Sequence, residues 1–298
     1  MPKPITVLVA GATGRQGGAV ARLLLEKGHR VRALTRRPGS QAAAALHVLG
    51  AELFEADLDD EASVQAAAEG ADAFFLVATP FEEGARAEAR QGKRAADAAK
   101  KAGVQHLVYS SAAWANQATG VPHLESKREV ERHVEGLGVP YTIVAPAFFM
   151  ENVLRASSLE RLRAGTLSLP LGPARKLYMV AVADIAGLVR LALERRSEHA
   201  GRRIDVASDA LTGPEMAKAL SQATGSDIGY SAASIDEVRS RSEDLALMWE
   251  WLERAGGSVD VEALRRSHPE AEWHDFGRWA REQDWSVLDE ASPGQPTA

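Results

Sequence analysis

The sequence predicts an α/β protein with a doubly wound parallel sheet and a smaller, mainly helical C-terminal lobe. Three observations predict it. Short apolar runs alternate with longer amphipathic segments through the first half, a turn of the form G-x-x-G-x-x-G joins the first run to the first helix, and the alternation stops after Asn152. Strands separated by helices form parallel sheets with right-handed crossovers, the Rossmann arrangement.

Composition narrows the class of protein. The chain has 298 residues, 45% of them hydrophobic and 26% charged, with no cysteine. This suits one large domain, or a domain with an added lobe, around a packed core. Without cysteine there are no disulfides, thiolate metal sites or cysteine nucleophiles, and the eight histidines lack metal-ligand spacing, so no metal site is expected.

Charge and hydropathy exclude other classes. The net charge is −6, which disfavours binding to nucleic acid or to an anionic membrane. No segment has the pattern of a signal peptide, and the longest mostly apolar stretch is too short to cross a bilayer. The expected location is therefore the cytoplasm.

Six strands are expected in the first half, as apolar runs of the kind that parallel sheets bury on both faces. They span residues 5–10, 30–35, 52–55, 73–77, 106–111 and 141–145. Helices are expected between them at residues 16–27, 42–49, 62–69, 85–102 and 122–136. The Arg and Lys residues of 85–101 alternate with acidic residues, which favours a solvated helix face over a nucleic-acid patch.

The chain divides into three expected parts. Residues 1–152 form a Rossmann domain, residues 153–288 the smaller lobe, and residues 289–298 a disordered polar tail. Strands near 177–182 and 203–207 are expected to complete the main sheet. Thr212 and Ser234 each begin a capping box, predicting helices that run to about Thr224 and Arg254.

The glycine-rich turn has the spacing of a dinucleotide-binding loop. Gly11 can make the tight turn, Gly14 lets the backbone approach a pyrophosphate, and Gly17 lets the helix pack against the sheet. The amides at the helix start then face the anion. Its place between an apolar strand and an amphipathic helix favours dinucleotide binding, with Thr13, Arg15 and Gln16 as further cofactor-binding residues.

The end of the second strand indicates which cofactor binds. An acid that binds a ribose 2′-hydroxyl belongs there, but the residues are Thr35, Arg36 and Arg37. Guanidinium groups suit a 2′-phosphate, so NADP(H) is expected over NAD(H). The alternative is that both arginines are a solvated strand end. Asp57, followed by Leu58, is placed at the adenine, or is a turn or helix-cap residue.

Several motifs resemble those of the NmrA-like branch of the atypical short-chain dehydrogenases/reductases. They are GATGRQGG from Gly11, TRRP from Thr35, EADL from Glu55, HLESK from His123 and VAPAFFMEN from Val144. The resemblance runs from about Ile5 to Trp285. It implies a Rossmann domain with a small C-terminal lobe and NAD(P)(H) in the cleft between them.

The resemblance also implies site residues. Typical members of the superfamily use Tyr-x-x-x-Lys on the helix after the fifth strand, and here these positions are His123 and Lys127. Lys127 is expected to hold the nicotinamide ribose. His123 either donates a proton or is a partly exposed helix residue. Ser110 is expected at the cofactor, although Ser111 or Ala112 are alternatives for the superfamily's substrate-binding serine position.

Further cofactor and substrate contacts are expected at strand ends. Ala78, Thr79 and Pro80 follow the fourth strand and are expected along the cofactor, as are Pro146 and Phe149 after the sixth. The substrate-pocket candidates are Trp114, Phe148 and Asn152, and the aromatic ones could equally be core. Trp249, Trp251, Trp273 and Trp279 are interpreted mostly as the core of the lobe.

Two functions follow from these expectations. The first is an NADPH-dependent oxidoreductase acting on a flat, aromatic or quinone-like small molecule, such as a quinone, an enone or a dye. The second is a non-catalytic NADP(H) redox sensor acting through a protein partner. The missing tyrosine favours the sensor, and the retained Lys127 favours chemistry.

Overall fold

The computed structural model describes residues 3–288, and these form two compact units. Unit 1 contains the residues up to Pro146, together with 182–206 and 266–272. Unit 2 contains residues 147–181 and 207–265 and those from Trp273 onward. The segment predicted to be a disordered tail, 289–298, lies outside the described residues.

A seven-stranded sheet forms the centre of unit 1, in the order β10-β6-β5-β4-β1-β2-β3, with all its pairings parallel. The strands are β1 (Thr6–Val9), β2 (Arg30–Thr35), β3 (Glu52–Glu55), β4 (Ala73–Leu76), β5 (His106–Ser110), β6 (Tyr141–Pro146) and β10 (Arg202–Val206). The predicted doubly wound parallel sheet is confirmed. Its strand order reverses between β1 and β4, the switch point where such sheets bind ligands.

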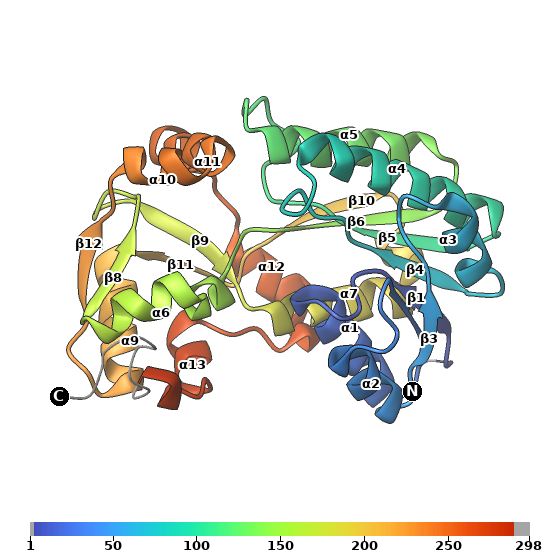
Figure 1. The fold of residues 1–298 in the computed structure, drawn as a ribbon, viewed down its shortest axis with the longest axis horizontal. Helices are drawn as coiled ribbons and strands as arrows, with labels where there is room; N and C mark the ends of the chain where they lie inside the picture. The colour runs from blue at the N-terminus through green and yellow to red at the C-terminus, as the bar shows by residue number, and fades with distance from the viewer. Residues whose placement is uncertain (1–2, 289–298) are drawn as a thin grey trace. The chain divides into compact units, whose positions relative to one another are not determined.

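Helices cover both faces of this sheet (Figure 1). One face carries α1 (Arg15–Glu26), α2 (Gln41–Val48) and α7 (Val182–Glu194), and the other carries α3 (Glu61–Ala68), α4 (Ala85–Lys101) and α5 (Pro122–Gly136). Two short elements, α8 (Arg196–His199) and η2 (Pro269–Ala271), complete unit 1. Ser40 and Asp60 begin α2 and α3, because their side chains accept hydrogen bonds from backbone N–H groups of the first turn.

The core of unit 1 follows from the alternation of side chains along the strands. Leu8, Phe74 and Leu107 stand in register on β1, β4 and β5, and all are fully buried against the face that α3, α4 and α5 cover. Their neighbours Val7, Val9 and Val108 are buried too, on the opposite face. Burial on both faces explains why these strands are continuous apolar runs.

Unit 2 contains two small sheets and several helices. The strands are β7 (Phe148–Phe149), β8 (Thr166–Leu169), β9 (Lys176–Val180), β11 (Asp209–Thr212) and β12 (Gly229–Ala232). The helices are η1 (Met150–Leu154), α6 (Ala156–Arg163), α9 (Gly213–Thr224), α10 (Ile235–Arg241), α11 (Glu243–Ala255), α13 (Phe276–Arg281) and η3 (Ser286–Leu288), and α12 (Val261–Ser267) crosses the border with unit 1. Trp249, Trp251 and Trp279 are buried, as predicted for core residues, and Trp273 is half-buried.

Two expectations for this part of the chain are wrong. The strand near 177–182 does not join the main sheet. As β9 it pairs with β7 and β11, and the edge beside β6 is occupied by β10. The helix predicted from Ser234 to about Arg254 is two helices, because Ser242 is extended and its side chain accepts a hydrogen bond from the Leu245 N–H, which starts α11. The capping box of Thr212 and Glu215 is confirmed.

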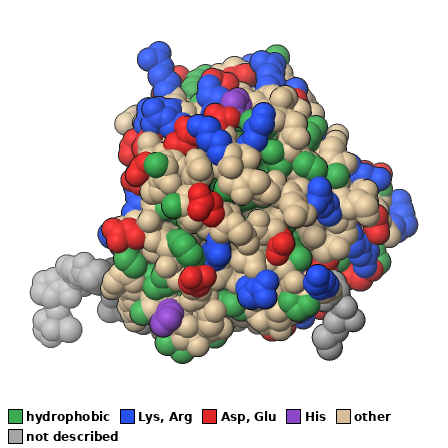
Figure 2. Space-filling view, turned by 90° about the vertical axis from the view of Figure 1, so that its right-hand side faces the viewer, with side chains coloured by type: hydrophobic (Ala, Val, Ile, Leu, Met, Phe, Trp, Pro, Cys, Tyr) green, Lys and Arg blue, Asp and Glu red, His purple; other side chains and the backbone are tan. Residues whose placement is uncertain are grey.

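The surface carries intermixed charges. In the face shown in Figure 2, Lys and Arg side chains alternate with Asp and Glu side chains and with uncharged ones. Within residues 3–288, no helix combines the length and the apolar character that a membrane span requires.

Candidate functional site

The glycine loop after β1 is closed so tightly that two of its positions exclude a side chain. Gly11 has a φ of +59°, and a Cβ there would lie 3.0 Å from Val77 Cγ1. A Cβ on Gly17 would lie 2.3 Å from the Gly11 carbonyl oxygen and 2.5 Å from that of Ala10. The first turn of α1 therefore lies directly against the end of β1, as a phosphate loop requires.

The N-terminus of α1 presents backbone amides without a competing side chain. Its N-cap residue is Gly14, which has no side chain to cap the helix, and the first turn contains no acidic residue. Thr13, Gly14 and Arg15 are exposed. Orphan N–H groups at the positive end of a helix dipole bind an anion such as a diphosphate.

Gln16 connects the loop to the neighbouring strands. Its side chain is buried, and its Nε2 donates to Ser110 Oγ over 2.7 Å, at the carboxyl end of β5. Two predicted cofactor residues that are 94 positions apart are thus in direct contact. The bond fixes the start of α1 relative to β5, across the switch point.

The two arginines after β2 have different surroundings. Arg36 Nη2 lies 2.6 Å from Glu82 Oε2, and both side chains are about half exposed. This hydrogen bond raises the pKa of the Arg36 guanidinium above its ordinary value. Arg37 is exposed, and its backbone N–H donates to Thr35 Oγ1. Both guanidinium groups thus lie at the surface, where a 2′-phosphate is predicted to bind.

Asp57 forms a turn after β3. Its Oδ1 accepts the Asp59 N–H over 2.9 Å, and its own N–H donates to Ser63 Oγ. This geometry is that of the turn residue that the sequence allowed as an alternative. Asp57 and Leu58 are half-buried at the strand end, so an adenine contact stays a prediction.

The segment after β4 carries Ala78, Thr79 and Pro80. Ala78 is buried, Thr79 is exposed and accepts the Phe81 N–H, and the Pro80 carbonyl accepts the Gly84 N–H. The Ala78 carbonyl accepts a hydrogen bond from Lys127 Nζ over 3.3 Å. The predicted residues after β4 therefore meet the predicted ribose-binding lysine.

Lys127 is held in a buried polar cluster. Its Nζ lies 2.8 Å from Glu88 Oε1, and the other carboxylate oxygen of Glu88 accepts from Ser126 Oγ. Glu88 is fully buried, and the side chain of Lys127 is 11% exposed. The ammonium also lies 5.9 Å from the centroid of the Tyr109 ring.

His123 shares the helix face of Lys127 but is not at the surface. It lies one turn earlier on α5 and is 7% exposed, so the interpretation as a partly exposed helix residue is wrong. Tyr109 cannot replace the missing tyrosine, because it is fully buried, and this burial raises the pKa of its phenol well above the ordinary value.

Ser111 has a different role from Ser110. Its Oγ donates to Glu131, a fully buried residue of α5 that also accepts from Arg128 and, over 3.0 Å, from Arg203 Nε. Because successive residues of a strand point to opposite faces, Ser110 meets α1 and Ser111 meets α5. Arg203 also donates to the Ala112 carbonyl, so this second cluster connects β5, α5 and β10.

Trp114 lies beyond β5 in a strained conformation. Its φ is +64°, rare for a bulky residue, and its backbone N–H donates to Asp205 Oδ1 over 3.2 Å. It is 7% exposed. Pro146, at the end of β6, is buried and accepts the Ala113 N–H. Stacking of Trp114 on a flat substrate stays a prediction.

The remaining candidates belong to unit 2. Phe148 and Phe149 are half-buried on β7, where the ring of Phe148 lies 5.6 Å from that of Trp249. Asn152 lies on η1 and its carbonyl accepts from Ser158 Oγ. The contact with Trp249 agrees with a core role for Phe148. A substrate contact stays a prediction for Phe148 and Asn152, and a cofactor contact stays one for Phe149.

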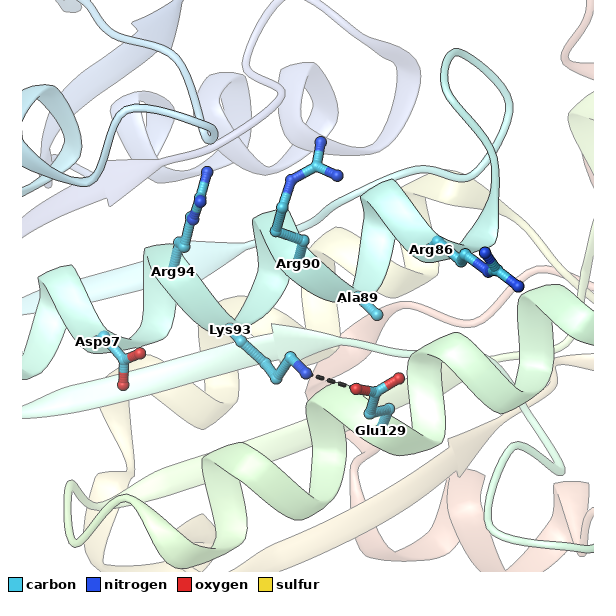
Figure 3. A pocket seen from close by; sticks show the side chains of 7 residues that line it. All are labelled: Arg86, Ala89, Arg90, Lys93, Arg94, Asp97 and Glu129. Atoms are coloured by element: carbon cyan, nitrogen blue, oxygen red, sulfur yellow. Dashed lines mark hydrogen bonds and ion pairs between the residues drawn. The ribbon is translucent and has the colours of Figure 1, made fainter.

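A separate hollow runs along α4 and α5 and contains none of the predicted site residues (Figure 3). Its lining is Arg86, Ala89, Arg90, Lys93, Arg94, Asp97 and Glu129. Lys93 pairs with Glu129, as Figure 3 shows, and Arg90 and Arg94 pair with Asp59. This pairing agrees with the solvated helix face that the sequence predicts for α4.

Four residues of these polar clusters were not predicted from the sequence: Glu88, Ser126, Glu131 and Arg203. One signal could have revealed Glu88. It shares a helix face with Gly92, Ala95, Ala96 and Ala99, which are buried, so a carboxylate stands in a row of small core residues. A Cβ on Gly92 would lie 2.7 Å from Val130 Cγ2, which shows how closely α4 and α5 approach.

The chain is similar to known proteins over most of its length. The model of the NmrA-like family matches residues 3–279. An NAD(P)H azoreductase from Xenophilus azovorans is 31% identical over 233 residues, which cover 78% of this chain and 79% of that protein.

Solved structures share the fold. NmrA, a negative transcriptional regulator in complex with NADP, superposes with a TM-score of 0.77 at 25% identity, over 94% of this chain and 95% of that one. An NADPH-dependent quinone oxidoreductase from Escherichia coli has a TM-score of 0.77 at 23% identity, over 95% of this chain and all of that one.

Proposed function

Because this chain belongs to the NmrA-like family, whose model spans residues 3–279, we propose that it is an NADPH-dependent reductase of a flat acceptor such as a quinone, an enone or a dye. It has the NAD(P)-binding oxidoreductase fold of that family. One observation carries the proposal. The glycine loop after β1, the Lys127–Ala78 contact after β4 and the Gln16–Ser110 bond at β5 lie at the carboxyl ends of three adjacent strands.

The residues present fit a dinucleotide. Gly11 and Gly17 leave the backbone bare where a diphosphate would approach, and the uncapped start of α1 supplies amide donors. Lys127 would hold the hydroxyls of the nicotinamide ribose. Arg36 and Arg37 would bind a 2′-phosphate, and the absence of a carboxylate between Thr35 and Arg37 removes the group that selects NAD(H).

The proposed reaction requires little acid–base catalysis by the protein. When bound, NADPH supplies a hydride to the acceptor. A quinone or dye that receives it can take its proton from water, so the position held by His123 need not act as an acid. The chain's own part is then to bind and orient, which can supply a large share of rate acceleration. Similarity to an azoreductase supports a flat acceptor.

The second candidate is a redox sensor that binds NADP(H) without turnover. His123 in place of the expected tyrosine favours it, as does similarity at 25% identity to a transcriptional regulator in complex with NADP. The two functions are separated by titrating the protein with NADPH by calorimetry and offering the same complex a panel of quinones and azo dyes. A reductase oxidises the bound NADPH, and a sensor binds it and leaves it intact.

A further inference from the structure

The ion pair of Lys127 and Glu88 is the most deeply buried charged contact of the candidate site. Glu88 belongs to α4 and Lys127 to α5, 39 positions apart, and their charged atoms are 2.8 Å apart. Removing two charges from water is costly unless each finds close partners. The location of this pair in the fold therefore calls for an explanation beyond stability.

Every oxygen of the Glu88 carboxylate is used. Oε1 accepts from Lys127, and Oε2 accepts from Ser126 Oγ, which also contacts the His123 carbonyl. One turn along α4 the two helices approach each other closely, since a Cβ on Gly92 would lie 2.7 Å from Val130 Cγ2. Glu88 is thus a fixed anchor.

The anchor determines the direction of the ammonium. An ammonium has three N–H donors. Two of those on Lys127 are directed to Glu88 Oε1 and to the Ala78 carbonyl, both protein groups that are themselves buried. Within residues 3–288 the third donor has no protein acceptor, and the side chain remains 11% exposed. One donor is therefore available to a ligand at the end of β4, where the ammonium also lies 5.9 Å from the centroid of the Tyr109 ring.

We propose that Glu88 is a positioning residue for cofactor binding: it holds Lys127 so that the remaining N–H is presented to the hydroxyls of the nicotinamide ribose. This rests on the proposed function, in which Lys127 binds that ribose. Glu88 itself touches neither cofactor nor substrate. Its contribution is pre-organisation, since a lysine that is fixed in advance loses less freedom on binding.

The test compares two ligands that differ in the nicotinamide ribose. NADPH contains it, whereas 2′,5′-ADP contains only the adenosine part with its 2′- and 5′-phosphates. Glu88→Gln keeps the size and one oxygen of the side chain but removes the charge. We expect NADPH to bind about tenfold more weakly or worse, which is the value of one charge-assisted hydrogen bond, and 2′,5′-ADP to bind as in the wild type.

Glu131→Gln is the matched control. Glu131, on α5, is also fully buried, and its carboxylate binds Ser111, Arg128 and Arg203 but forms no hydrogen bond with Lys127. Its substitution costs stability in the same way but leaves the ratio of the NADPH and 2′,5′-ADP affinities unchanged. In a Lys127→Ala background, Glu88→Gln has no further effect on NADPH affinity.

The outcomes distinguish the two claims. If Glu88→Gln weakens the binding of NADPH and of 2′,5′-ADP equally, while the wild type binds NADPH more tightly than 2′,5′-ADP, the role of Glu88 is refuted. The ribose contact of Lys127 is not refuted by that result. A wild type that binds NADPH no more tightly than 2′,5′-ADP overturns the ribose contact and the proposed function with it. If Glu88→Gln does not fold, Ser126→Ala removes the hydroxyl on Oε2 and leaves the ion pair. A smaller loss confined to NADPH supports the proposal, and equal losses contradict it.

Discussion

Arg36 and Glu82 form an ion pair of 2.6 Å at the end of β2, where the 2′-phosphate of NADP(H) is proposed to bind. Glu82 comes from the loop between β4 and α4. The carboxylate already occupies one of the five N–H donors of the guanidinium, so it competes with a phosphate for Arg36.

The first prediction concerns cofactor choice. NADPH should bind more tightly than NADH. Arg36→Asp should lower the affinity for NADPH by about 10- to 100-fold, because a hydrogen bond to a charged group contributes roughly 1.5–3 kcal/mol. Glu82→Gln should raise the affinity for NADPH by up to about fivefold, because it removes an exposed ion pair with Arg36, and such pairs contribute about 0–1 kcal/mol. Calorimetric titration with both cofactors measures these changes. Equal affinity of the wild type for NADPH and NADH would refute the assignment.

The second prediction tests the close approach in the glycine loop. Gly17→Ala places a methyl group 2.3 Å from the Gly11 carbonyl oxygen, so the loop must open. We expect a loss of about 1–3 kcal/mol in the free energy of unfolding, and weaker NADPH binding. Gly39→Ala is the control, because a Cβ there meets nothing within 4 Å. Urea unfolding of both variants measures the difference in stability. A Gly17→Ala protein as stable as Gly39→Ala would contradict the close approach in the loop.

The third prediction is a loss of stability in mild acid. Burial lowers the pKa of His106 to about 4 from its ordinary value of 6.5, and repulsion from Arg196 and His199 adds to this. The unfolded chain therefore binds a proton between pH 6.5 and 4 that the folded protein excludes. Stability from this residue is complete above pH 6.5 and falls as the pH drops toward 4.

The hydrogen bonds of His106 show which of its ring nitrogens lacks a proton in the folded protein. Thr142 Oγ1 donates to the His199 carbonyl, so His106 Nε2 donates to Thr142, and Nδ1 has no partner within residues 3–288. His106→Gln, which keeps an N–H donor, should flatten the decrease in unfolding free energy between pH 7 and pH 5. Urea unfolding at these two pH values measures this decrease. If the variant loses as much unfolding free energy between them as the wild type does, the effect belongs to other groups.

The fourth prediction concerns His123. If it donated a proton, His123→Phe would slow reduction of carbonyl-type acceptors by roughly 10²–10⁴-fold and spare quinones. We expect instead that quinone and carbonyl rates both persist, because the residue lies on the first turn of α5 and is 7% exposed. Steady-state rates with one acceptor of each class measure this, and a selective loss with the carbonyl acceptor would make His123 a catalytic acid.

Local patterns in the sequence predicted the parts of the fold that depend on local structure. The turn from Gly11 to Gly17 and the buried strands were predictable because spacing and apolar runs report on neighbouring residues. The sheet that β9 joins was not, because its partners Phe148 and Leu211 lie far away in the chain.

The same limit applies to the candidate site. Lys127 was indicated by the resemblance to the superfamily's Tyr-x-x-x-Lys motif, whereas its partner Glu88 depends on how α4 packs against α5. Glu82 was not predictable as the partner of Arg36, since the contact joins two loops that are 46 positions apart.

The central claim is that this chain transfers a hydride from NADPH to a flat acceptor. The most direct measurement follows the near-ultraviolet absorbance of NADPH in the presence of the protein and a panel of quinones and azo dyes, using NADPH with either hydrogen or deuterium at the transferred position. The account predicts saturable, protein-dependent oxidation with at least one acceptor, slower with the deuterated cofactor. Tight binding of NADPH with no oxidation by any of them would contradict it and favour the sensor.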